Sequence, residues 1–142
     1  MAASALIDTG VVLALLDRRD KWHNPCVEVY SRALLPLLTT EAVLAEVFHL
    51  TYRNLREVHG VWTLVNSGAI RLASIEHDEL SSVRSLMDEY ADRPMDFADA
   101  TLVHLAARES LSVILTVDHD DFETYRIAGR KRFTILPTRA AR

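Results

Sequence analysis

The sequence predicts an α/β protein with a central parallel sheet of four to five strands and helices on both faces. Short apolar runs of strand length alternate along the chain with segments of helical periodicity, and strands separated by helices form parallel sheets. Of the 142 residues, 49% are hydrophobic, which is enough for one packed core. We therefore expect a single three-layered domain over residues 1–142, with a basic C-terminal tail from about residue 137.

The predicted strands are the short apolar runs. Small and apolar residues form the first run, and Pro36 in the second indicates either an edge strand or the start of a strand. The expected strands cover residues 3–7, 35–38, 69–75, 112–117 and 132–136.

The predicted helices lie between these strands. Asn24 and Pro25 have the pattern of a cap and a first helical residue, and Thr39 or Thr40 caps a longer helix. Apolar residues at three- and four-residue spacing predict an amphipathic helix before residue 90. The expected helices cover residues 10–16, 24–34, 40–56, 58–66, 76–90 and 96–109, with charged loops at 17–22 and 118–122.

The charge of the chain is −4 in total, but residues 126–142 contain six basic and no acidic residues. Such a segment is either a phosphate-contacting surface or a solvated tail. The single cysteine, Cys26, excludes an internal disulfide and a multi-cysteine zinc site. The chain shows no membrane-span-length apolar stretch and no secretory signal pattern, so we expect a cytoplasmic protein without membrane contact.

Two acidic residues directly follow predicted buried strands. Asp8 ends the first apolar run and Asp118 ends the fourth. Ligand sites of open α/β sheets lie at the carboxyl ends of strands, so both residues are site candidates, although Asp8 could equally cap the next helix. Asp120 and Asp121 follow closely, and we expect Asp120 at the surface and Asp121 as the cap of a turn.

Two further acidic positions lie in predicted helices. Glu46 is the only charge in the apolar window 42–48, so it is either buried at a site or exposed on an unusually narrow face. Asp96 and Asp99 open a helix, where each suits a cap or the helix dipole. The two alanine neighbours of Asp99 favour it as the site residue, which leaves Asp96 as a cap or a supporting acid.

Four acids are therefore expected to meet at one edge of the sheet: Asp8, Glu46, Asp99 and Asp118. Two carboxylates about 4 Å apart repel by roughly 4 kcal/mol at an effective dielectric constant of 20. A cluster of four costs several times that, whereas a domain is stable by only about 5–15 kcal/mol. Such a cluster must bind protons or cations. Oxygen ligands without cysteine or paired histidines suit Mg²⁺ or Mn²⁺. His119, next to Asp118, is expected at the surface.

These motifs resemble the PIN domain, and within that family the small bacterial VapC-type toxins. The likeness covers essentially the whole chain and rests on four segments in order: Leu6-Ile7-Asp8-Thr9, Thr39-Thr40 with Glu46, Pro94-Met95-Asp96-Phe97-Ala98-Asp99-Ala100, and Leu115-Thr116-Val117-Asp118 with Asp121-Phe122. The resemblance implies that Asp8 and Asp99 are the principal Mg²⁺ ligands. It also implies that Glu46 and Asp118 complete a catalytic quartet. The family pattern does not settle the roles of two extra acids, Asp96 and Asp121. Thr9 and Thr116 are expected to support the site beside these acids.

The function implied by the resemblance is that of a Mg²⁺-dependent endoribonuclease, the toxin of a toxin–antitoxin system, which hydrolyses RNA phosphodiesters at a carboxylate-bound metal. The expected partners are an RNA substrate, a small antitoxin protein and a second copy of the chain in a homodimer. One set of apolar residues is either core or part of a partner groove: Trp22, Val47, Phe48, Leu50 and Tyr52.

Two alternatives remain. The chain could be a catalytically weak PIN-like module that binds RNA or protein. A phosphatase or phospho-acceptor domain that uses Asp8 as its nucleophile fits less well. Gly10 stands where a dehalogenase-like enzyme needs a second aspartate, and Lys131 precedes the last strand, whereas a receiver domain needs a lysine after a late strand.

Overall fold

The computed structural model describes residues 2–139. Its strands form one five-stranded parallel sheet in the order β3-β2-β1-β4-β5, so the predicted fold class is confirmed. Leu6 in the central strand lies opposite Leu38 on one side and Ile114 on the other. The strands are β1 (Ala5–Ile7), β2 (Leu37–Thr39), β3 (Ile70–Leu72), β4 (Val113–Leu115) and β5 (Thr134–Leu136).

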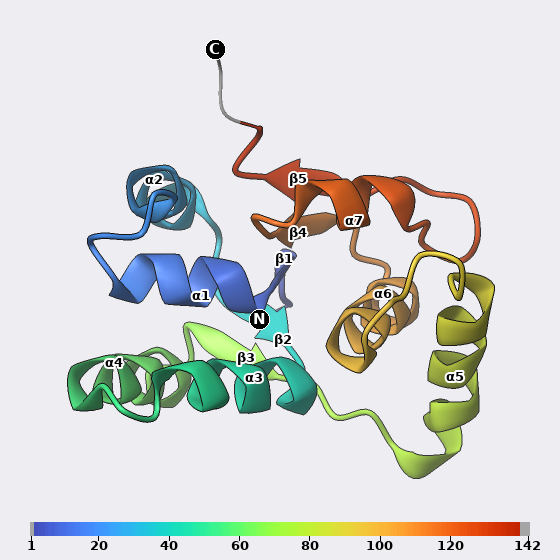
Figure 1. Cartoon of the computed structure of the whole chain (residues 1–142), viewed down its shortest axis with the longest axis horizontal. Helices are drawn as coiled ribbons and strands as arrows, with labels where there is room; N and C mark the ends of the chain where they lie inside the picture. Colours follow the sequence, from blue (N-terminus) through green and yellow to red (C-terminus); the bar gives the residue numbers. More distant parts are fainter. Residues whose placement is uncertain (1, 140–142) are drawn as a thin grey trace.

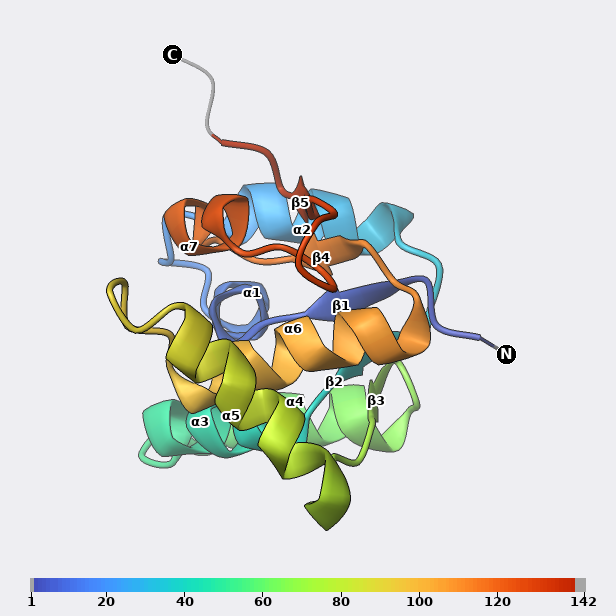
Figure 2. The ribbon, with the colours of Figure 1, turned by 90° about the vertical axis from the view of Figure 1, so that its right-hand side faces the viewer.

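Helices cover both faces of the sheet and complete three layers. The described helices are α1 (Thr9–Leu16), α2 (His23–Arg32), α3 (Glu41–Thr51), α4 (Leu55–Asn66), α5 (Leu80–Glu89, preceded by the 3₁₀ turn His77–Glu79), α6 (Phe97–Glu109) and α7 (His119–Thr124). Helices α1, α2 and α4 lie on one side of the strands and α5 and α6 on the other (Figure 1). Figure 2 shows α5 and α6 in front of the strands. Within residues 2–139, none of these helices has the length and apolar character needed to cross a membrane.

The core is centred on β1, which is buried on both faces. Leu6 and Ile7 have no exposed surface, and neither do Val11 of α1 or Leu102 and Leu105 of α6. A central parallel strand between two helical layers has to be apolar on both sides. This requirement explains why the strand appears in the sequence as a continuous apolar run rather than as an alternating one.

Helix α2 begins earlier than predicted. Trp22 occupies the cap position, so Asn24 and Pro25 lie inside the first turn, where a proline costs no hydrogen bond. Val27 of α2 and Leu34, just after it, are 41% and 76% exposed. The fully buried residue of α2 is Cys26, which packs into the core.

Other boundaries also differ from the prediction. The expected helix over residues 40–56 ends at Thr51, because the Asn54 side chain accepts a hydrogen bond from the Glu57 N–H at 3.1 Å and starts α4. The expected loop at 118–122 is largely helix α7, which Asp118 caps. Pro36 directly precedes β2, an internal strand, so it marks a strand start and not an edge.

Candidate metal centre

The strand order changes direction between β1 and β4. From β1 the chain adds β2 and β3 on one side, and β4 and β5 then lie on the other. In open α/β sheets, ligands bind outside the carboxyl ends of the strands at such a reversal. Asp8 follows β1 directly and Thr116 follows β4 directly, so both residues stand at this position.

Asp8 is a helix cap and also part of a buried acidic site. It is 7% exposed, and its Oδ1 accepts a hydrogen bond from the Thr9 N–H at 2.7 Å. Its Oδ2 accepts a second bond from the Thr116 hydroxyl at 2.8 Å. Burial, with smaller contributions from the charges of Glu46 and Asp96, raises the pKa of Asp8 from 3.8 to about 6 despite these hydrogen bonds. The interpretation of Asp8 as a helix cap is confirmed, and its role as a site residue stays a prediction.

Asp99 lies in the first turn of α6, on the opposite side of the site. The helix is capped by Asp96, whose Oδ1 accepts a hydrogen bond from the Asp99 N–H at 2.8 Å. Asp99 is 8% exposed, and its Oδ2 accepts a hydrogen bond from the Tyr125 hydroxyl at 2.9 Å. Burial, followed by the charges of Asp8 and Asp96, raises the pKa of Asp99 to about 8. A carboxyl group with this pKa carries a proton at neutral pH unless a cation replaces it.

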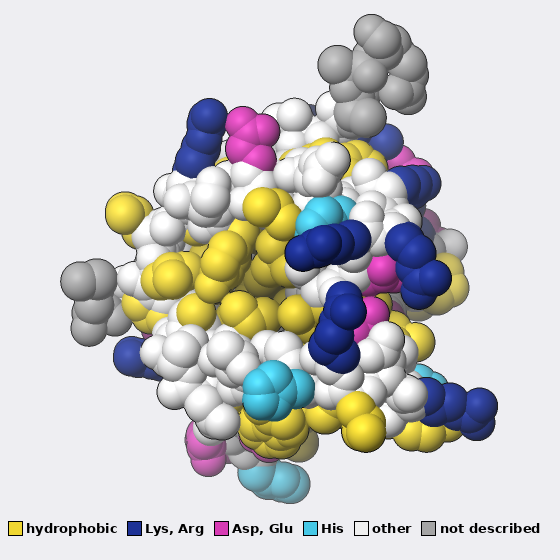
Figure 3. All heavy atoms as spheres, turned by 90° about the vertical axis from the view of Figure 1, so that its left-hand side faces the viewer, with side chains coloured by type: hydrophobic (Ala, Val, Ile, Leu, Met, Phe, Trp, Pro, Cys, Tyr) yellow, Lys and Arg dark blue, Asp and Glu magenta, His cyan; other side chains and the backbone are white. Residues whose placement is uncertain are grey.

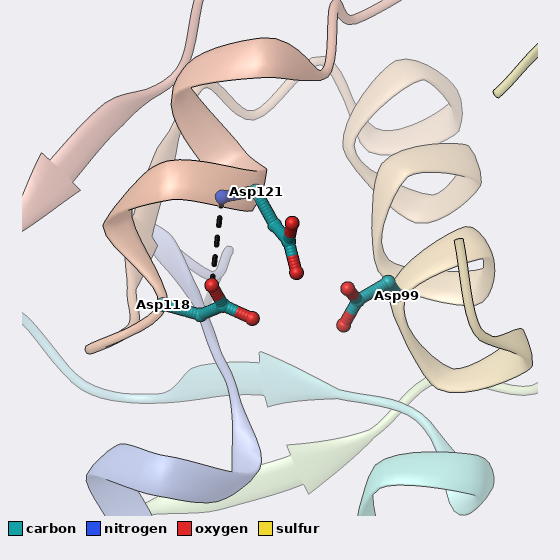
Figure 4. A group of neighbouring side chains, drawn as sticks. All are labelled: Asp99, Asp118 and Asp121. Carbon is teal, nitrogen blue, oxygen red and sulfur yellow. Dashed lines mark hydrogen bonds between the residues drawn. The ribbon is translucent and has the colours of Figure 1, made fainter. Parts of the chain in front are cut away.

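Helix α7 brings two more carboxylates to Asp99. Oxygen atoms of Asp99, Asp118 and Asp121 all lie within 4.8 Å of one another, and Figure 4 shows the two side chains of α7 extending toward α6. The Asp118 N–H donates to the Thr116 hydroxyl at 3.0 Å. Desolvation, followed by the neighbouring Asp121 carboxylate, raises the pKa of Asp118 to about 6.

Glu46 reaches the site through one intervening side chain. It is half-buried on α3, and its Oε1 accepts a hydrogen bond from the Thr9 hydroxyl at 2.6 Å. Thr9 therefore contacts Glu46 with its hydroxyl and Asp8 with its backbone N–H. The structure groups Asp99 and Asp118 most closely with Asp121, whereas Glu46 lies beside Asp8 at the start of α1.

Three residues near the site were missed or misplaced by the sequence prediction. Tyr125 donates a hydrogen bond to Asp99. The sequence signal for its burial is its position three residues after Phe122 in an apolar pattern. Arg93 had drawn no attention, and its Nε lies 3.0 Å from Asp121 Oδ1. His119 was expected at the surface but is 6% exposed, because the Pro137 carbonyl satisfies its Nε2 at 2.8 Å.

The segment after β5 is attached to the outer side of α7. Besides the His119 contact, the Arg139 guanidinium pairs with both Asp120 and Glu123. Asp120 is exposed, as predicted. The tail expected from residue 137 is thus bound to α7 as far as Arg139, while Arg142 lies outside the described residues.

The donor set suits a hard divalent cation. Each candidate ligand is a carboxylate oxygen, and such oxygens are the preferred ligands of Mg²⁺ and Mn²⁺. Desolvation first, and neighbouring carboxylates second, raise the pKa of Asp8, Asp99 and Asp118, so these groups favour a proton or a cation at this position. The hydrogen bonds from Thr116 and Tyr125 fix the direction in which two of these carboxylates point, as the supporting partners of metal ligands do.

Comparison with known proteins identifies a family and a similar structure. The family model of the PIN domain matches residues 5–128. Among solved structures, the chain is similar to VapC20 of Mycobacterium tuberculosis, a sarcin-ricin loop cleaving toxin, with a TM-score of 0.74 and 19% sequence identity over 82% of this chain and 92% of that one. This likeness shows a shared fold. No match was found among curated proteins.

Proposed function

The chain belongs to the PIN domain family, and from this premise we propose that it is a Mg²⁺-dependent endoribonuclease. The proposal rests above all on the carboxylate oxygens of Asp99, Asp118 and Asp121, which come within 4.8 Å of one another at the strand reversal where ligands bind. A divalent ion bound there would orient a phosphodiester, lower the pKa of a bound water and stabilise the leaving oxygen. Mn²⁺ has the same ligand preference and is expected to substitute.

The proposed roles of the residues follow from their contacts. Asp8 and Asp99 are proposed as the principal ligands, and each is held by a hydroxyl donor, from Thr116 and Tyr125 respectively. The proton that the raised pKa places on Asp99 has to leave before that carboxylate can coordinate. Metal affinity should therefore increase with pH through the range in which Asp99 ionises.

The remaining acids are proposed to support these two ligands. Glu46 and Asp118 would hold metal-bound waters or a second ion, and Asp121 lies close enough to share that role. Asp96 orders the first turn of α6 as its cap, and Thr9 connects Glu46 to the start of α1.

We propose further that the protein is the cytoplasmic toxin of a toxin–antitoxin pair, with RNA as substrate, a small antitoxin as partner and a homodimer as its assembled form. The shared fold with VapC20 supports this. Leu50 and Tyr52, from the apolar set named earlier, are 56% and 58% exposed. Val47 belongs to the core, whereas Trp22 and Phe48 are half-buried against it.

Apolar surface suited to a partner also lies beside α2. A groove of about 600 Å³ runs along α2, β4 and the segment after β5, and its apolar lining includes Trp22, Val29 and Leu136. Figure 3 shows apolar side chains gathered across this side of the molecule, with Lys and Arg along one edge. Contiguous apolar surface of this kind is typical of protein-binding sites.

The decisive test is RNA cleavage by the purified protein with Mg²⁺ and with EDTA, together with the Asp8→Asn variant. We expect Mg²⁺-dependent cleavage of structured RNA that falls by at least about a hundredfold in Asp8→Asn, since a charged ligand of the site is lost. Asp88→Asn, which removes an exposed carboxylate of α5, is the matched control and should cleave like the parent. Unchanged cleavage in Asp8→Asn would refute the assignment. RNA binding without any cleavage would favour the catalytically weak binding module.

A further inference from the structure

One cationic side chain lies directly against the acidic group. Arg93, in the loop between α5 and α6, places its Nε 3.0 Å from Asp121 Oδ1. Among the ion pairs formed by residues 2–139, this is the one that involves Asp99, Asp118 or Asp121. The Arg93 side chain is 44% exposed and that of Asp121 is 29% exposed, so the pair lies at the open side of the site.

The contact orients the guanidinium and leaves most of its donors free. Only Nε is engaged, and within the described part of the chain neither Nη group of Arg93 donates a hydrogen bond. A guanidinium is planar and carries five N–H donors in a rigid fork. When one edge of the plane is held by a carboxylate, the two Nη groups are directed together toward whatever occupies the adjacent space.

The loop that carries Arg93 is fixed at both ends. The Tyr90 hydroxyl accepts a hydrogen bond from the Arg126 N–H at 2.9 Å, and the Tyr90 ring packs against Tyr125 with centroids 5.1 Å apart. At the other end Met95 is buried and Asp96 caps α6. Arg93 therefore lies between Tyr90, which packs against the Tyr125 that donates to Asp99, and helix α6, which carries Asp99. The contacts that place Asp99 also place Arg93.

We propose that Arg93 binds a phosphate group of the RNA at this site and that Asp121 holds it in the orientation to do so. This inference rests on the proposed ribonuclease function. An acidic site repels RNA, and a fixed guanidinium beside the carboxylates supplies the positive charge that a non-bridging phosphate oxygen requires. The paired Nη donors match phosphate geometry in a two-point contact, which a lysine ammonium does not reproduce.

A purely structural role for Arg93 leads to different expectations. If Arg93 only neutralised Asp121, its removal would disturb the carboxylates and weaken binding of the metal ion. If Arg93 contacts RNA, its removal releases the Asp121 carboxylate, so the metal ion should bind at least as tightly while RNA binding weakens.

The test measures RNA and metal binding separately in Arg93→Gln and Arg93→Lys. Arg84→Gln is the matched control, because Arg84 also pairs through Nε with an aspartate, Asp88, but on the exposed side of α5 at 3.7 Å. The RNA probe is a fluorescein-labelled oligoribonucleotide library of random sequence. Its binding is followed by anisotropy at increasing KCl, with Ca²⁺ present to reduce turnover. Mn²⁺ binding without RNA is measured by titration calorimetry.

We expect Arg93→Gln to bind the RNA library on the order of tenfold to a hundredfold more weakly than the parent, as for loss of a charge-assisted hydrogen-bond pair. The slope of log affinity against log salt should decrease by about 0.7, the value for one phosphate contact on a single strand. Arg93→Lys should keep the parent slope but bind more weakly than the parent. The RNA affinity of Arg84→Gln should match that of the parent or exceed it. The Mn²⁺ affinity of Arg93→Gln should also match that of the parent or exceed it.

Equal RNA affinity and salt slope in the parent and Arg93→Gln would overturn the inference. A parallel loss of Mn²⁺ and RNA affinity in Arg93→Gln would overturn it as well, because that pattern indicates a structural role. If Arg93→Gln fails to fold, Arg93→Lys decides the question, and parent-like RNA affinity in that variant refutes the two-point contact. A parent that neither binds nor cleaves RNA with Mg²⁺ refutes the proposed function itself, a result separate from any effect of Arg93.

Discussion

Replacement of Asp99 by asparagine should make the metal-free protein more stable and its stability less dependent on pH. The pKa of Asp99 is raised from 3.8 to about 8 by burial and by neighbouring negative charge. The folded state therefore holds a proton that the unfolded state has released between about pH 4 and pH 8. Because the folded state binds more protons in that window, the free energy of unfolding falls as pH rises through it.

The size of the effect follows from the same shift. A pH of 7 lies about three units above the ordinary pKa that this carboxyl group has in the unfolded state. The difference lowers the free energy of unfolding by at most about 4 kcal/mol. This is a large fraction of the 5–15 kcal/mol that stabilises a typical domain. Asparagine carries no charge and still offers an oxygen to the Tyr125 hydroxyl, so Asp99→Asn should recover most of this free energy. Functional sites commonly exchange stability for activity in this way.

The assay is urea denaturation followed by circular dichroism at several pH values between 4 and 8. In EDTA, the stability gap between Asp99→Asn and the parent should be near zero at pH 4 and should widen toward pH 8. Mg²⁺ should stabilise the parent and leave the variant nearly unchanged. Asp88→Asn controls for the loss of one exposed charge. A gap that is independent of pH, or a variant less stable than the parent at pH 8 in EDTA, would refute the reasoning.

Two further substitutions test the surroundings of the site. Tyr125→Phe removes the hydroxyl that lowers the pKa of Asp99, so half-saturation with Mn²⁺ should require a higher pH than in the parent. The exposed control Tyr52→Phe should behave like the parent, and calorimetric curves that coincide for Tyr125→Phe and the parent would contradict this expectation. Gly10→Ala places a Cβ 2.6 Å from a Val117 methyl group, so we expect the free energy of unfolding, measured by urea denaturation, to fall by about 1–3 kcal/mol. An unchanged midpoint would show that the segment around Val117 moves to accommodate the methyl group at no cost.

The parts of the structure predicted correctly are those that depend on local pattern. Asp8 directly follows β1, as predicted, whereas β4 already ends at Leu115 and Asp118 lies three residues further on, as the exposed cap of α7. Parallel strands bring both positions to one edge of the sheet. The caps of α3 and α6, at Thr40 and Asp96, were also visible in the sequence. These features need only a few neighbouring residues to be recognised.

The errors arose where a local signal competed with another or where a tertiary contact decided the outcome. Three acids in four residues were taken for a loop, yet the spacing of Asp118 and Asp121 is that of a helix cap. The apolar pattern that continued past Thr51 hid the cap at Asn54. No local pattern predicts that Tyr125 donates to a carboxylate 26 residues earlier in the chain, because that contact exists only after α6 and α7 have packed together.

The attachment of residues 137–139 to α7 has a practical consequence for handling the protein. Arg139 and Pro137 hold the outer side of a helix whose inner side carries Asp118 and Asp121. Shortening the chain at that end, or joining an affinity tag to it, therefore risks shifting two carboxylates without altering either residue. A tag is better placed before Ser4, because β1 begins at Ala5 and the acidic site lies beyond the opposite end of that strand.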